Sequence, residues 1–186
     1  GPARLLRRPE EIRPETVREI LVVRTAYIGD VIMTIPILRP LRQRFPQARI
    51  TFLTAARAKP VLEGNPDLDA VLSYEPFWFY PTPKAAYPAF VRELRRLPFD
   101  LVIEARADIR DLFLLVRPLR ARYKVSYDVG GGGYLLSHVV PYPGLRHKVE
   151  YHLDIARFLG CDVGPVAWGV HLGAEELDRV DALLAR

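Results

Sequence analysis

The sequence predicts an α/β fold in which helices cover both faces of a parallel sheet. Short apolar runs alternate along the chain with stretches whose apolar residues recur at helical spacing. One of these runs, Asp100–Ala105 ("DLVIEA"), is apolar almost without interruption, as is typical of a strand buried on both faces of a parallel sheet. The chain has 186 residues, of which 49% are hydrophobic, and this is enough for one sizeable domain of that kind.

The individual elements follow from the same periodicities. Strands are predicted at Ile20–Arg24, Ile50–Leu53, Ala70–Ser73, Asp100–Ala105 and Tyr123–Tyr127. Helices are predicted from Val31 to Phe45, with Pro36 in the first turns or at a kink, and at Pro60–Glu63, Ala89–Leu97, Asp108–Leu119, Val149–Leu159 and Ala174–Arg186. The segment Glu75–Pro88 holds four consecutive aromatic residues among four prolines, so neither a regular strand nor a regular helix is expected there.

Composition narrows the classes of partner. A net charge of +5 favours anionic partners, whereas the scattered Lys and Arg residues match no nucleic-acid-binding motif, so we expect no nucleic acid. The single cysteine, Cys161, excludes a disulfide framework and fits a reducing compartment, so a cytoplasmic location is expected. The turn after the first strand is "TAYIG" and not G-x-G-x-x-G, and no G-K-[ST] is present. The usual nucleotide-binding fingerprints are thus missing, and no cofactor is expected. The histidines lack metal-ligand spacing, so no metal is expected either.

Gly29 and Asp30 form the first candidate site. They lie after the first strand, and ligands of open α/β sheets bind outside the carboxyl ends of the strands. Gly29 permits a tight turn or a close approach of a ligand to the backbone. Asp30 has two interpretations that do not exclude each other, a helix N-cap and a catalytic carboxylate at the mouth of the sheet.

Three basic residues form a second candidate group. Arg106 follows the fourth strand and Arg110 lies in the next helix, which places both on the same rim as Asp30, and Lys148 begins a later helix. Guanidinium groups there suit phosphate or carboxylate, although a solvated helix face explains them equally well.

Two further segments stay open at this point. The aromatic run Phe77–Tyr80 is suited to a membrane or acceptor contact, or to covering the core. The four glycines Gly130–Gly133 are suited to a mobile loop, or to a cradle of backbone N–H groups for phosphate.

With these residues in view, the sequence resembles glycosyltransferase family 9, the ADP-heptose–lipopolysaccharide heptosyltransferases. The resemblance runs from about Ile20 to Gly160 and depends on four segments in order: "ILVVRTAYIGDVIMTIPILRPLRQRFPQARITFLT", "NPDLDAVLSY", "FDLVIEARADIRDLFLL" and "RHKVEYHLDIARFLG". Departures from the family pattern are Glu104, where many relatives have Asp, and Ala107, where many have Gly.

The resemblance implies the N-terminal half of a GT-B fold, which consists of two Rossmann-like domains. On this basis we expect a basic leader at 1–19, the acceptor-side domain at 20–173 and the start of an interdomain linker helix at 174–186. The C-terminal domain that binds the nucleotide sugar is expected to be absent, so we expect the isolated chain to be inactive.

The resemblance also implies a reaction. Asp30 would be the general base of an inverting transfer of heptose from ADP-heptose to the lipid A–Kdo region of lipopolysaccharide, without a metal. Gly29, Arg106, Arg110 and Lys148 would bind this lipid-linked anionic acceptor, with peripheral contact at the inner face of the cytoplasmic membrane. Two alternatives remain open from the residues alone, namely a non-catalytic α/β module that binds an anionic ligand or partner, and a family member that transfers another sugar.

Overall fold

The fold is built on a six-stranded sheet whose neighbouring strands are all parallel, in the order β3-β2-β1-β4-β5-β6. The computed structural model describes residues 10–185. The strands are β1 (Glu19–Arg24), β2 (Arg49–Thr54), β3 (Ala70–Ser73), β4 (Leu101–Glu104), β5 (Tyr123–Tyr127) and β6 (His138–Val140).

The strand order reverses at the centre of the sheet. From β1 the chain moves outward to β2 and β3, returns to β4 on the other side of β1, and moves outward again to β5 and β6. The loops that follow β1 and β4 therefore diverge and open a crevice at the carboxyl edge, which is where open α/β sheets bind ligands. Asp30 lies beyond the end of β1 and Arg106 beyond the end of β4.

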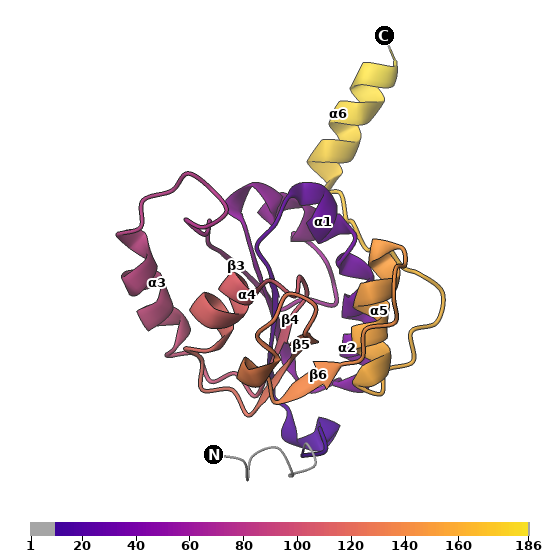
Figure 1. Ribbon diagram of the computed structural model, residues 1–186. Helices are drawn as coiled ribbons and strands as arrows, with labels where there is room; N and C mark the ends of the chain where they lie inside the picture. The colour runs from indigo at the N-terminus through magenta and orange to yellow at the C-terminus, as the bar shows by residue number, and fades with distance from the viewer. Residues whose placement is uncertain (1–9, 186) are drawn as a thin grey trace.

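Helices cover both faces of the sheet (Figure 1). They are α1 (Ile28–Ile32), α2 (Leu38–Arg44), α3 (Ala86–Leu94), α4 (Ile109–Asp111), α5 (Lys148–Phe158) and α6 (Ala174–Leu184). The 3₁₀ segments are η2 (Pro14–Thr16), η3 (Ile35–Ile37), η4 (Ala56–Leu62) and η6 (Gly133–Leu135), and η5 (Leu112–Val116) is a π-helical turn that continues α4.

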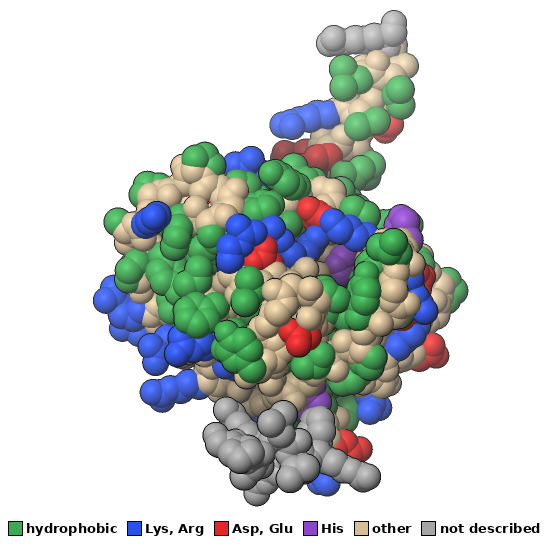
Figure 2. Space-filling view, viewed as in Figure 1, with side chains coloured by type: hydrophobic (Ala, Val, Ile, Leu, Met, Phe, Trp, Pro, Cys, Tyr) green, Lys and Arg blue, Asp and Glu red, His purple; other side chains and the backbone are tan. Residues whose placement is uncertain are grey.

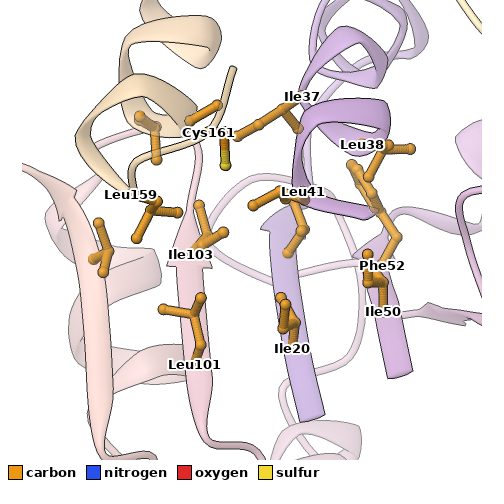
Figure 3. Close-up of a cluster of buried hydrophobic side chains, with 14 of the residues drawn as sticks. Ile20, Ile37, Leu38, Leu41, Ile50, Phe52, Leu101, Ile103, Leu159 and Cys161 are labelled. Atoms are coloured by element: carbon orange, nitrogen blue, oxygen red, sulfur yellow. The ribbon is translucent and has the colours of Figure 1, made fainter. Parts of the chain in front are cut away.

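Two clusters of buried apolar side chains lie on opposite faces of the sheet. On one face, β1, β2 and β4 pack against α1, η3, α2 and α5 through side chains such as Ile20, Leu41, Phe52 and Ile103 (Figure 3). On the other face, Leu21, Val23 and Val102 of the same strands pack against α3 and η5. Because side chains alternate along a strand, this burial on both faces requires the nearly continuous apolar sequence of the central strands.

The helix predicted from Val31 to Phe45 is broken into α1, η3 and α2. Proline has no backbone N–H and clashes with the preceding turn, so Pro36 ends the first segment and sits in the first turn of η3. The break turns α2 along the sheet while it leaves α1 at the carboxyl edge, and this geometry positions Asp30.

Other differences are smaller. Strand β6 is not among the predicted elements, and α3 begins at Ala86, where Ala89 is predicted. Residues 1–9 of the predicted leader 1–19 lie outside the described residues, and the rest is not uniformly solvated, because Val17 is buried in the core.

Helix α6 projects away from the body of the molecule, and its described side chains are exposed (Figure 1). Within residues 10–185, no helix has the length and apolarity that crossing a bilayer would need.

Candidate functional site

Asp30 is held by basic side chains from two distant parts of the chain. Its Oδ1 accepts hydrogen bonds from Nη2 of Arg24 at 2.8 Å and from Nζ of Lys148 at 2.6 Å. Arg24 is the last residue of β1, and Lys148 is the first residue of α5. The carboxyl end of β1 and the N-terminus of α5 therefore meet at the carboxylate of Asp30.

The expectation that Asp30 caps a helix is wrong. The N-cap of α1 is Tyr27, and Asp30 is the third residue of the helix. Its carboxylate is turned toward Arg24 and Lys148 because two full charges attract it more strongly than the weak dipole of a five-residue helix.

Gly29 does not occupy a turn either. It lies within α1, and open space surrounds the position where a Cβ would stand. The absence of a side chain at Gly29 leaves room beside Asp30. Of the two interpretations of this glycine, the close approach of a ligand to the backbone therefore remains.

The ionisation of Asp30 depends on its neighbours. Partial burial disfavours the carboxylate, but the hydrogen bond from Lys148 and the charge of Arg24 outweigh it and hold the pKa of Asp30 below that of a free aspartate. Asp30 is therefore ionised at neutral pH.

Arg24 is the fixed partner of the pair. Its side chain is 3% exposed, and Nη1 donates to the carbonyl oxygen of Ala105 at 3.3 Å. A buried charge is stable only when it is paired, so Asp30 also supports the fold at this point. The Nε atom of Arg24 is buried and has no hydrogen-bond partner among residues 10–185.

His152 completes the support from α5. Its Nδ1 faces the carbonyl oxygen of Met33 at 2.8 Å and its Nε2 faces that of Ala105 at 3.1 Å. Burial, aided by the charge of Arg24, lowers the pKa of His152 to about 4, so the ring is neutral at physiological pH. Thr34 donates to the backbone carbonyl of Asp30 at 2.8 Å and lies 3.4 Å from Nε2 of His152.

A cavity of about 230 Å³ opens beside this network. Three cationic residues line it, and aromatic side chains form another part of its wall: Arg24, Arg106, Lys148, Tyr127, Tyr142 and Tyr151. The rings of Tyr142 and Tyr151 stack with an interplanar angle of 5°. On the surface, blue basic and red acidic side chains are interleaved with purple histidine across the upper middle of this face (Figure 2).

Arg106 and Arg110 are tied to neighbouring acidic groups. Nη2 of Arg106 lies 3.2 Å from Asp108, and its guanidinium lies 4.1 Å from the ring centroid of Phe79. Arg110 binds Asp108 through Nε and Nη2 and donates to the carbonyl of Trp78. The structure thus brings Arg106 and Lys148 to the same cavity, whereas Arg110 is not among the residues that line it.

The aromatic segment is anchored to the segments that follow β1 and β4. The hydroxyl of Tyr80 donates to the carbonyl of Ala26 at 2.9 Å, and Nε1 of Trp78 donates to the buried carboxylate of Asp111 at 2.8 Å. Of the three interpretations of this segment, the structure supports covering of the core, because Trp78 packs against the apolar cluster on the α3 face.

The glycine loop packs against the segment that follows β4. A Cβ at Gly130 would lie 2.5 Å from the carbonyl oxygen of Ala107. Ala107 itself has a φ of 59°, a left-handed conformation that glycine adopts more easily. The close contact fixes the turn that carries Arg106.

Several residues of the site were not predicted from the sequence. In the sequence, Arg24 is the end of a predicted strand, and the other residues come from three separate segments, namely Tyr127, Tyr142 and the neighbours Tyr151 and His152. A basic residue at the end of an otherwise apolar buried strand is the one signal that could have indicated Arg24. Among residues 10–185, no group of three His, Cys, Asp or Glu residues is arranged to hold a metal ion.

The curated relatives and the solved structures that resemble this chain point to one family. No protein-family model matches the chain. Lipopolysaccharide heptosyltransferase 3 of Escherichia coli strain K12 is 31% identical over 141 residues, which are 72% of this chain and 40% of that protein. A second Escherichia coli protein of the same name is 29% identical over 140 residues, with 72% and 41% covered. The chain thus spans about two fifths of the length of these curated relatives.

Solved structures share the fold. A family 9 glycosyl transferase from Veillonella parvula DSM 2008 superimposes with a TM-score of 0.74 at 18% identity, covering 90% of this chain and 49% of that one. The Escherichia coli heptosyltransferase WaaC with ADP gives a TM-score of 0.67 at 20% identity, covering 81% and 51%. Fold and site define a Rossmann-like α/β domain of the type found in glycosyltransferases. The chain belongs to glycosyltransferase family 9.

Proposed function

We propose that the chain is the acceptor-side domain, residues 20–173, of an inverting glycosyltransferase. The proposed reaction transfers heptose from ADP-heptose to a lipid-linked anionic sugar, the lipid A–Kdo region of lipopolysaccharide. The observation that carries this proposal is the carboxylate of Asp30. It is ionised at the carboxyl edge of the sheet, beside a cavity that is lined by cations. The similarity to heptosyltransferases supports the choice of sugar.

Asp30 acts as the general base in this proposal. Among the described residues, hydrogen-bond donors reach Oδ1 and none reaches Oδ2, so one oxygen is open to an acceptor hydroxyl. As the hydroxyl proton moves to Asp30, the acceptor oxygen attacks the anomeric carbon and the bond from that carbon to the ADP oxygen breaks. ADP leaves from the opposite face, so the configuration is inverted. General base catalysis of this kind contributes roughly 10²–10⁴-fold in rate.

The acceptor would be held by charge. Arg106 and Lys148 line the cavity and present cations to a phosphate or carboxylate of the acceptor, and open space at Gly29 admits the sugar. Arg110 lies outside the cavity lining and is paired with Asp108, so it would meet the acceptor only beyond the cavity. The donor nucleotide would bind mainly outside residues 20–173, and its leaving-group charge would be stabilised there without a metal cofactor.

A lipid-linked acceptor implies that the transfer takes place at a membrane surface. We place the protein in the cytoplasm, in peripheral contact with the inner face of the cytoplasmic membrane. The exposed arginines Arg92, Arg95, Arg96 and Arg120 surround a shallow hollow beside Tyr87. Such a cluster, together with the net charge of +5, is attracted to anionic lipid headgroups.

The test uses the protein encoded by the complete reading frame that contains these residues, with ADP-heptose and lipid A–Kdo as substrates. We expect transfer to be detected, and Asp30→Asn to lower kcat by a factor on the order of 10²–10⁴ while KM for the acceptor changes much less. ADP-glucose in place of ADP-heptose separates this proposal from a relative that transfers another sugar.

Asp154→Asn is the matched control. Asp154 has the same exposed side-chain fraction as Asp30, 16%, and it also pairs with two cations, Arg146 and Arg157. Its replacement should leave kcat within a few-fold of the unmodified enzyme. Similar rates for the two variants, or near-normal kcat in Asp30→Asn, would remove Asp30 from the chemistry. Absence of any transfer would favour the non-catalytic binding module.

A further inference from the structure

Lys148 occupies an electrostatically unfavourable place in its own helix. It is the first residue of α5, an 11-residue helix whose N-terminus carries partial positive charge. A cation at this end is repelled by the helix dipole, whereas the opposite end would favour it. The contact that offsets this repulsion is the one between Nζ and Oδ1 of Asp30, at 2.6 Å. Lys148 is therefore kept in place by Asp30 and not by its helix.

The two counter-ions of Asp30 differ in how firmly they are held. The guanidinium of Arg24 is buried and also donates to Ala105, so it has no alternative position. The side chain of Lys148 is 51% exposed, and it ends in a compact ammonium group on a flexible four-carbon stem. Moving this ammonium group by a rotation of its stem leaves the core unchanged, whereas moving Arg24 would not.

The cavity offers the ammonium group of Lys148 an alternative position. Lys148 lines the space of about 230 Å³ that also borders Arg106, Tyr142 and Tyr151. Arg106 is engaged with Asp108 and stacked on Phe79, so Lys148 is the cation in this cavity with the freest side chain. An anionic group that enters the cavity would meet it first.

We propose that Lys148 is a positioning residue, a displaceable counter-ion that an anionic group on the acceptor sugar draws away from Asp30. Asp30 then becomes a stronger base only when the acceptor is seated. The proposal rests on the proposed function of Asp30 as general base. It assigns the acceptor a carboxylate or phosphate close enough to its reacting hydroxyl for both to reach the same cavity.

The chemistry of the displacement is a competition for one ammonium group. While Lys148 donates to Asp30, its charge stabilises the ionised carboxylate and lowers the pKa of Asp30 together with Arg24. When Lys148 moves to the anion of the acceptor, Asp30 keeps Arg24 but loses the other donor. The affinity of Asp30 for a proton rises when the hydroxyl proton of the bound acceptor is available. Part of the binding energy of the acceptor therefore lowers the barrier to the reaction.

Other charged groups around α1 have partners of their own. Arg57 and Lys59 belong to η4, which packs against α1, and they pair with Glu75 and Glu63. Arg106, on the β4 side, pairs with Asp108 and Asp111. Burial raises the pKa of Glu104 to about 8, so its carboxyl group is mostly protonated at neutral pH, and it accepts hydrogen bonds from Ser126 and two backbone N–H groups. His152 is neutral and approaches only the backbone side of Asp30, through Thr34. Lys148 is thus the exposed charge that directly contacts Asp30.

The test measures the pKa of Asp30 by carboxyl ¹³C NMR on the 186-residue chain. We expect Lys148→Met to raise this pKa toward that of a free aspartate. In the unmodified chain, methyl glucuronide or glucose 6-phosphate should raise it as well, at constant ionic strength, whereas the neutral methyl glucoside should not. The two anionic probes distinguish a carboxylate from a phosphate.

The variants also separate displacement from a general loss of charge. Anionic probes should produce no further rise in Lys148→Met. The variant Lys59→Met removes a lysine of comparable exposure from the neighbouring η4 and should leave the pKa of Asp30 unchanged. An unaltered pKa in Lys148→Met, or an unmodified chain that responds to neither anionic probe, overturns the proposal.

A kinetic measurement on the complete enzyme gives a second readout. The acid limb of kcat/KM reports the free enzyme and that of kcat reports the acceptor complex. We expect the apparent pKa of the base to be higher in kcat than in kcat/KM, and the two to coincide in Lys148→Met. Equal values in the unmodified enzyme contradict displacement while leaving Asp30 as the base, so the two proposals fail separately.

Discussion

His152 makes the stability of the domain depend on pH. Its ring is almost fully buried between α5, the carbonyl of Met33 and the end of β4, and its pKa is lowered to about 4 by burial and by the charge of Arg24. Because the folded pKa lies below the unfolded value near 6.5, the unfolded chain binds the proton more tightly. The stabilisation is complete above about pH 6.5 and is lost as the pH falls toward 4.

We expect the free energy of unfolding to fall by about 3 kcal/mol across this window, since each unit of pKa shift corresponds to about 1.36 kcal/mol. Urea titrations at several pH values between 7 and 4.5 measure this loss. The neutral variant His152→Gln should be less stable at pH 7 but should lack most of the slope. An equally steep slope in that variant would assign the dependence to other groups.

Asp30 shows how far a single residue can be predicted from the sequence. Its position after the first strand predicts a place on the rim of the sheet, and the structure puts it there. Its contacts could not be predicted, because Lys148 is brought to it by the packing of α5 against η3 and not by any local spacing. The same contacts give Asp30 a structural role, since Asp30→Asn would leave the buried cation Arg24 without an opposite charge.

At the scale of elements, the aromatic segment between β3 and α3 is anchored by polar contacts within an apolar setting. The carboxylate of Asp111 is fully buried, and burial raises its pKa, while the indole N–H of Trp78 opposes this effect by donating to it. Removing a donor from a buried acceptor leaves the acceptor unsatisfied, which is costly.

We therefore expect Trp78→Phe to lower the free energy of unfolding by about 1–3 kcal/mol, beyond the change in packing. The urea midpoint measures the loss. Trp168→Phe, which replaces the second tryptophan at a side chain that is 49% exposed, is the control and should change stability by less than about 0.5 kcal/mol. Equal effects of the two replacements would show that the bond to Asp111 contributes little.

Element boundaries were predictable where the local signal was strong. β3 and β5 occupy the residues predicted for them, because short apolar runs between turn residues leave little alternative. β6 has only three residues and pairs with β5 alone, so its sequence carries too little periodicity to be recognised. Proline explains why one predicted helix is three segments, although the sequence does not say whether Pro36 bends a helix or ends it.

At the scale of the whole molecule, stability is distributed unevenly. β1 has hydrogen-bonded neighbours on both sides and buried side chains on both faces. α6 has 11 residues and no buried side chain, and isolated helices shorter than about 12–15 residues are marginal in water.

We expect amides of α6 to exchange with deuterium within about tenfold of the rate of an unstructured peptide, whereas amides of β1 and β4 exchange only through global unfolding. Hydrogen exchange read by NMR or by mass spectrometry on the 186-residue chain makes the comparison. Strong protection of α6 would mean that its apolar side is covered in solution, for example by a second copy of the chain.

The central position of β1 also matters while the protein is being made. Ile20 pairs with Leu101, so this strand must wait for a partner that is synthesised about 80 residues later. At roughly 5–20 residues per second, the ribosome needs about 4–16 s to supply β4. During that interval one side of the strand that will become the middle of the sheet is an open edge, and an open apolar edge can pair with other chains. A pause in translation before residue 100 would prolong the period in which the nascent chain is prone to aggregate.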